Sequence, residues 1–114
     1  WSDRRRKNPN RALGIALRSL AAHKNKTPGM LFDVAMHFLN MRFFNLRDKH
    51  ISLEEVDQEL GRIGCKPDRR AAFMHFLTLL AGLAFGSVKT QKTYDQLATE
   101  LQTFLRELDQ HPLA

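Results

Sequence analysis

The chain has 114 residues, of which 43% are hydrophobic and 26% are charged, and its net charge is +6. This length fits one domain with a single core, and the composition excludes collagen-like and low-complexity architectures. The longest apolar run, residues 71–85, is shorter than the roughly 18 residues needed to cross a bilayer, so no membrane span is expected within the chain. The single cysteine, Cys65, excludes an intrachain disulfide, and we expect it to be a small buried hydrophobe.

Positive charge is concentrated near the N-terminus. Residues 1–26 contain eight basic side chains and one acid, whereas residues 27–114 contain ten basic and eleven acidic side chains. The body of the protein is therefore nearly neutral, and we expect the N-terminal segment to face an anionic partner. We interpret residues 1–8 as a basic juxtamembrane or flexible segment and residues 9–111 as a single helical domain.

Two helices are predicted in the first part of the chain. Asn8-Pro9 is typical of a helix start, and leucines spaced by four and three residues predict a helix over residues 9–23. Its expected buried face contains Leu13, Leu17 and Leu20. Thr27-Pro28 repeats the start pattern for a second helix over residues 28–45, and the short connection favours an antiparallel pair.

Three further helices follow, and no stretch alternates like a strand. Ser52 and Glu55 form a capping-box pattern at the start of a third helix, which Gly64 is placed to end. The most apolar helix, over residues 69–85, is expected to be the buried centre of the bundle, with His75 as a hydrogen-bonded core histidine. A last helix over residues 91–109 presents an apolar stripe of Tyr94, Leu97, Leu101, Phe104 and Leu108. The predicted fold class is all-α, a compact bundle of about five helices arranged as hairpins around helix 69–85.

No residue pattern in the sequence supports catalysis, a cofactor or a metal site. The histidines lack zinc-ligand spacing, and a calcium loop ending at Glu55 would lack most of its oxygen ligands. Nucleophile-elbow and phosphate-loop motifs are absent from the sequence. The acids of the third helix, Glu54, Glu55, Asp57 and Glu59, are interpreted as partners of the helix dipole and of water, with a partner-binding acidic face as the alternative. We therefore expect a non-enzymatic protein.

The N-terminal cluster is the most informative polar feature. It consists of Trp1, Arg4, Arg5, Arg6 and Lys7. A solvated tail and a phosphate-binding segment for nucleic acid are two interpretations of the cluster. The favoured one is juxtamembrane, because Trp prefers the bilayer interface and Lys and Arg accumulate on the cytoplasmic side of a membrane span. We expect the chain to be a fragment that follows such a span, with this cluster on an anionic membrane surface.

Several segments resemble one protein family when they are taken in order. They are the basic RRRKNPNRAL, the aromatic-rich DVAMHFLNMRF, the pattern of Ser52, Glu54, Glu55, Val56, Leu60 and Gly64, the helix end at residues 82–86, and the closing TYDQLATELQTFLREL. Together they resemble the C-terminal cytosolic region of BatD-type proteins, a bacterial family named for aerotolerance in Bacteroides.

The resemblance implies a membrane-anchored envelope protein whose periplasmic part is built of immunoglobulin-like β-domains. It implies that this chain is the cytosolic domain, at the cytoplasmic side of the inner membrane. Its partners would be von Willebrand factor A-type proteins and a MoxR-type ATPase, and its role would be protein–protein interaction without catalysis. The alternative is a small basic nucleic-acid-binding helical domain that uses the same cluster with Arg11 and Arg18, although nucleic acid is the less favoured partner.

Overall fold

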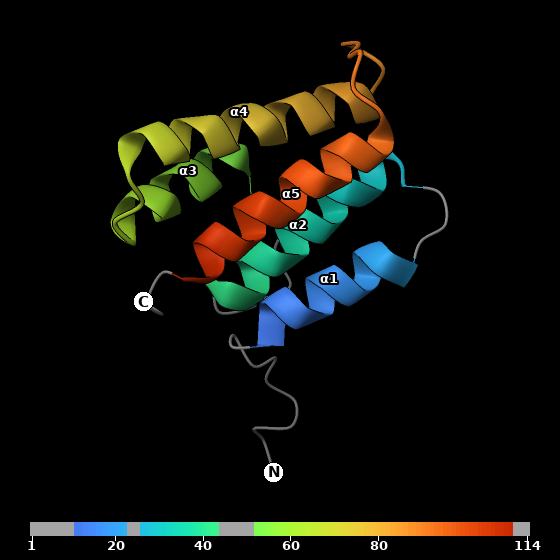
Figure 1. The fold of residues 1–114 in the computed structure, drawn as a ribbon. Coiled ribbons are helices and arrows are strands. Elements are labelled where there is room, and N and C mark those ends of the chain that lie inside the picture. The colour runs from blue at the N-terminus through green and yellow to red at the C-terminus, as the bar shows by residue number, and fades with distance from the viewer. Residues whose placement is uncertain (1–10, 23–25, 44–51, 111–114) are drawn as a thin grey trace.

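The computed structural model describes residues 11–22, 26–43 and 52–110, and these residues form five helices and no strand (Figure 1). The helices are α1 (Ala12–Ala22), α2 (Pro28–Arg42), α3 (Leu53–Arg62), α4 (Pro67–Ala84) and α5 (Tyr94–Asp109). The predicted all-α bundle is confirmed. The predicted division into residues 1–8 and 9–111 depends on residues outside the described ranges, and it stays a prediction.

Helix α2, not α4, lies at the centre of the bundle. It packs against α1, α4 and α5, and Leu31, Ala35 and Leu39 on it are fully buried. Helix α4 buries only one face, formed by Phe73, Phe76, Leu77 and Leu80. The prediction that helix 69–85 is the buried centre is therefore wrong. Its other faces include four alanines, which raise the mean hydropathy of the helix but are tolerated at a surface; they are Ala71, Ala72, Ala81 and Ala84.

The predicted local signals at the ends of α2 and α3 are confirmed, whereas Asn8-Pro9 lies outside the described residues. The Thr27 hydroxyl caps α2 by accepting a hydrogen bond from the Met30 backbone N–H at 3.2 Å. Ser52 and Glu55 form the predicted capping box, and Gly64 ends α3 with φ of +87°. A second capping box, between Thr93 and Gln96, starts α5 three residues later than predicted. Its geometry requires a non-helical backbone at Thr93, so residues 91–93 lie outside the helix.

Salt bridges show how the helices run relative to each other. Lys26, just before α2, pairs with Asp95 in the first turn of α5, and Arg42 at the end of α2 pairs with Asp109 at the end of α5. Helices α2 and α5 are therefore parallel. Arg69 near the start of α4 pairs with Glu107 near the end of α5, so α4 is antiparallel to both. We call residues 84–94, which join α4 to α5 at the end of the bundle where α2 begins, the α4–α5 tip (orange at the upper right of Figure 1).

The buried faces of the outer helices differ in detail from the predicted ones. Helix α1 buries Ala12, Ala16 and Leu20, whereas Leu13 and Leu17 are half-buried, because small alanines allow close approach to α2. On α5 the stripe is formed by Leu97, Ala98, Leu101, Leu105 and Leu108. Tyr94 is exposed and Phe104 is half-buried, so both lie outside the core stripe. Cys65 is buried, as predicted.

Candidate interaction site

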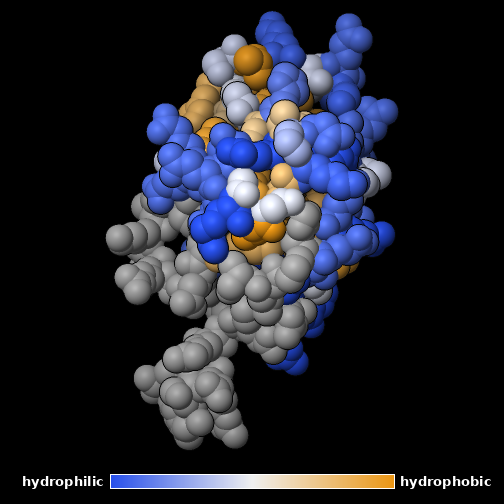
Figure 2. Space-filling view, turned by 90° about the vertical axis from the view of Figure 1, so that its left-hand side faces the viewer, coloured by the Kyte–Doolittle hydropathy of each residue, from blue (hydrophilic) through white to orange (hydrophobic). Residues whose placement is uncertain are grey.

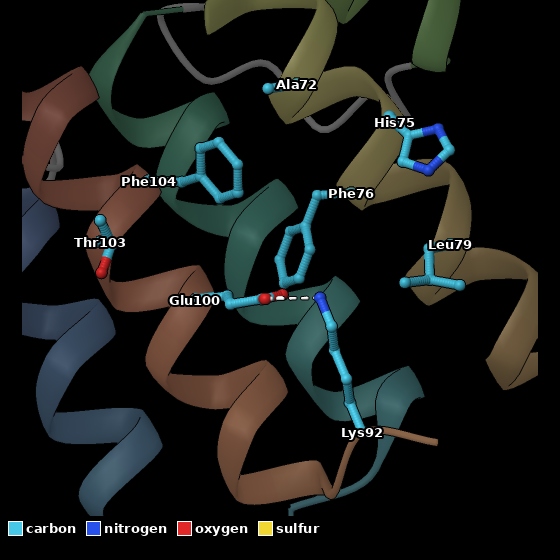
Figure 3. Close-up of a pocket in the computed structure, with 8 residues that line it drawn as sticks. All are labelled: Ala72, His75, Phe76, Leu79, Lys92, Glu100, Thr103 and Phe104. Carbon is cyan, nitrogen blue, oxygen red and sulfur yellow. Dashed lines mark hydrogen bonds and ion pairs between the residues drawn. The ribbon is translucent and has the colours of Figure 1, made fainter. Parts of the chain in front are cut away.

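A groove of about 370 Å³ lies between α4 and α5 (Figure 3). Its floor is apolar and consists of Ala72, Phe76, Leu79 and Phe104. The rings of Phe76 and Phe104 meet with their centroids 5.2 Å apart, and Phe76 is buried beneath the half-buried Leu79 and Phe104. The two helices thus leave an apolar strip partly open to solvent at this position. We call it the α4–α5 groove.

The rim of the α4–α5 groove is polar on both sides. Lys92, from the tip, extends along α5 to Glu100, and their Nζ and Oε1 atoms lie 2.6 Å apart (Figure 3). Thr103 stands beside them on α5, and His75 forms the opposite rim on α4. His75 is exposed, so the prediction of a buried core histidine is wrong. His75 lies on α4 at the edge of the groove, where its imidazole is exposed to water.

A smaller pocket continues the groove toward the start of α4. It has a volume of about 190 Å³, and Phe104 lines both hollows. Arg69 crosses it, with its Nε 2.9 Å from the Glu107 carboxylate and its guanidinium carbon 5.4 Å from the centre of the Phe104 ring. The groove therefore follows the α4–α5 seam and is bridged at one place by an exposed ion pair.

Cys65 lines the smaller pocket but is not activated there. Burial raises the pKa of its thiol, and the positive charges of Arg70 and Arg69 oppose this effect only in part. A thiol with a raised pKa is mostly protonated at neutral pH and is a poor nucleophile. Cys65 therefore acts as a packing residue.

The acids of α3 are largely engaged within the domain. Asp57 accepts a hydrogen bond from Arg70 at 2.8 Å, Glu59 pairs with Arg62, and Glu55 completes the capping box. These three acids therefore cap α3, stabilise it internally and attach it to α4, which favours a structural role over a partner-binding acidic face.

The predicted membrane-contact residues lie outside the described residues. They are Trp1, Arg4, Arg5, Arg6 and Lys7. Arg18 is exposed on α1, and Arg11 is exposed directly before the helix begins. Among the described residues, no group of acidic, histidine or cysteine side chains could hold a metal ion, and no helix has the length and apolar character needed to cross a bilayer. The predicted contact between the N-terminal cluster and a membrane stays a prediction.

Comparison of the chain with models of protein families, with curated proteins and with solved structures finds no match. The resemblance to BatD-type proteins therefore stays a prediction. The α4–α5 groove and the charges around it are the features from which a function can be inferred.

Proposed function

We propose that this chain is a non-enzymatic protein-interaction domain at the cytoplasmic face of a bacterial inner membrane, and that it binds a helix of a partner protein in the α4–α5 groove. The observation that supports docking is the apolar floor of Phe76, Phe104 and Leu79, which stays open between two polar rims. Such a strip favours the apolar face of an amphipathic helix, because each rim can meet the polar flank of that helix.

The dimensions of the groove suit a short helix. Between Arg69 and Leu79, which line its two hollows, α4 rises by roughly 15 Å, or about three helical turns. A partner with apolar residues at positions i, i+4 and i+7 places three anchors along this length. The partners implied by the BatD-type resemblance, von Willebrand factor A-type proteins and a MoxR-type ATPase, are the ones to test first.

The membrane location is supported by the composition of the N-terminal segment. Trp1 and the cations Arg4 to Lys7 form an interfacial pattern, and each cation near an anionic surface contributes roughly 1 kcal/mol. We propose that the chain acts by holding its interaction site at the membrane surface. The basic segment holds the domain against headgroups, and the groove faces the partner.

Site-specific photocrosslinking tests the docking proposal. A photoreactive amino acid is introduced at Thr103, at the rim of the groove, or at Arg106, an exposed residue of α5 that does not line it. We expect discrete protein adducts in bacterial cells for position 103 but not for position 106. Ala72→Arg, which fills the groove from α4, should abolish these adducts while the circular dichroism of the chain is unchanged. Equal adducts at both positions, or adducts that persist in the Ala72→Arg variant, would contradict docking in the groove.

The nucleic-acid alternative is separated from the membrane location by a binding assay. We expect the chain to sediment with vesicles that contain phosphatidylglycerol and to bind a DNA duplex weakly. Strong salt-dependent binding to the duplex without binding to vesicles would instead support nucleic-acid recognition. Arg11→Gln and Arg18→Gln would then weaken binding to the duplex, because both side chains are exposed and could contact phosphates.

A further inference from the structure

The α4–α5 tip displays apolar side chains that the rest of the described surface keeps covered. Phe85 is 87% exposed, Tyr94 is 50% exposed and Val88 is 42% exposed. No other large hydrophobic side chain of the described residues is exposed to this degree. The three residues fall within ten positions of the chain, so the tip gathers the exposed large apolar side chains of the described residues, and such a concentration is typical of a contact with another molecule.

The backbone holds Phe85 in this outward position. Phe85 closes α4, and Gly86 follows it in the left-handed conformation with φ of +74°. The turn is fixed by two hydrogen bonds, from the Gly86 N–H to the Leu83 carbonyl at 3.2 Å and from the Ser87 N–H to the Gly82 carbonyl at 2.9 Å. These bonds fix the backbone that follows Phe85, and within the described residues its side chain stays 87% exposed.

The charge of the tip identifies the chemistry of that cover. Residues 84–94 contain Lys89 and Lys92 and no acid. The charged groups packed nearby are Lys26, paired with Asp95, and Glu100, paired with Lys92. Lys89, which lies between Phe85 and Tyr94 in the sequence, is exposed and adds positive charge that these pairs do not balance. Aromatic rings flanked by lysines are typical of segments that rest in the interface of an anionic bilayer.

We propose that the α4–α5 tip is a second membrane contact, which inserts Phe85 among the headgroups of an anionic bilayer and places Lys89 beside their phosphates. This inference rests on the proposed membrane location. The tip projects beyond the ends of the helices (Figure 1), and a bilayer can deform around a projecting segment without a matching pocket. The tip lies at the opposite end of α2 from Arg11, roughly 25 Å away along the bundle. With both contacts made, the bundle lies along the membrane surface.

Attachment through the N-terminal cluster makes a weak second contact effective. A contact within one tethered molecule forms at a local concentration in the millimolar range, so the tip needs little affinity of its own. The burial of one phenylalanine and the approach of one lysine to the anionic surface together give an affinity of roughly millimolar strength, which is sufficient at this local concentration.

A single-tryptophan variant tests the insertion. Trp1→Phe combined with Phe85→Trp leaves one tryptophan, at the tip, because Trp1 is the only tryptophan of the chain. With vesicles of phosphatidylcholine and phosphatidylglycerol, we expect a blue shift of its emission and protection from iodide quenching. Vesicles of phosphatidylcholine alone should give neither change. Sedimentation with anionic vesicles while the tryptophan stays open to iodide would overturn the inference about the tip and leave the membrane location intact. Failure to sediment at all would overturn both.

Two substitutions measure the parts of the contact separately. Phe85→Ser should weaken vesicle binding about tenfold, because it removes the inserted ring. Lys89→Gln should weaken binding about fivefold, whereas Lys66→Gln, an exposed lysine at the other end of α4, should change it less than twofold. Equal losses for the two lysine variants would show that only net charge matters. Protection of the tip tryptophan by a protein partner, but not by vesicles, would assign the tip to protein docking instead.

Discussion

The C-terminal ends of α3 and α4 have the same backbone turn but send apolar side chains into opposite environments. Gly64 and Gly86 both adopt the left-handed conformation, with φ of +87° and +74°. After each glycine, a backbone N–H bonds the carbonyl five residues earlier, Cys65 to Leu60 at 3.0 Å and Ser87 to Gly82 at 2.9 Å. These bonds are common to the two turns, and at the end of α4 the Gly82 carbonyl also accepts from the Ser87 hydroxyl at 3.2 Å and from the Val88 N–H at 3.4 Å.

The residues around the glycines make the difference. At the end of α3, Cys65 and Leu60 are both buried, and they provide the apolar pair that usually accompanies this turn. At the end of α4 the same two positions hold Ser87 and Gly82, and the preceding Phe85 is exposed to water. At the opposite end of the bundle the described surface is mixed, with hydrophilic side chains around apolar ones near the centre and further apolar ones toward the upper left (Figure 2). The exposure of Phe85 thus comes from residue choice, and four experiments probe this contrast.

Leu60→Ala should have the largest effect. It deletes a fully buried side chain at the α3 turn, and we expect the free energy of unfolding to fall by about 3 kcal/mol. Urea unfolding followed by circular dichroism measures this loss. A loss below about 1 kcal/mol would mean that the α3 turn is not anchored in the core.

Gly64→Ala and Gly86→Ala should each cost about 1.5 kcal/mol, because an alanine is strained at positive φ. No atom lies within 4 Å of the added Cβ at either position, so the two losses should agree closely. Thermal unfolding of both variants makes the comparison. Unequal losses would show that the turns differ in backbone as well as in side chains.

The thiol of Cys65 and a thiol introduced at the matching position of the α4 turn, Ser87→Cys, should differ about tenfold in reactivity. Cys65 has a raised pKa because it is buried, whereas Ser87→Cys in a Cys65→Ala background places a thiol on the surface. A disulfide reagent at pH 8 measures both rates.

The raised pKa of Cys65 also makes the stability of the fold depend on pH. Its contribution to the free energy of unfolding is fully present below the thiol pKa of the unfolded chain, and it is lost as the pH rises through the higher pKa of the folded chain. Cys65→Ala should remove that part of the decline in stability at alkaline pH.

Phe85→Ser should have the smallest effect on stability. The side chain is exposed, so the free energy of unfolding should change by less than about 0.5 kcal/mol. Thermal unfolding measured without vesicles is the test. A substantial loss would place Phe85 in the fold and not at a contact surface.

The sequence predicts the helices well because their ends depend on local chemistry. Thr27 with Pro28, the Ser52 and Glu55 box, and Gly64 satisfy backbone groups within a few residues of themselves. Such short-range patterns need no knowledge of the tertiary structure. The capping box at Thr93 belongs to the same class and is visible in the sequence, and it would have given the start of α5.

The arrangement of the helices and the groove could not be predicted in this way. The central place of α2 depends on which neighbours surround it, and the hydropathy of one helix does not contain that information. Phe104 fits the α5 stripe by spacing, but in the bundle it lies between α4 and α5 and forms the groove floor with Phe76. The exposure of His75 has the same origin, because it follows from how far α5 stands from α4.

The attachment of α5 to α2 at both ends has a consequence for synthesis of the chain. Arg42 donates a hydrogen bond to the backbone carbonyl of Asp109, 67 residues later. At 5–20 residues per second, the ribosome needs roughly 3–13 s to make that intervening stretch. During this time the apolar face of α2 that α5 later covers is without its partner. The nascent chain thus passes through a stage of several seconds in which a chaperone has a binding surface, and a chain that stops before Tyr94 stays in that stage.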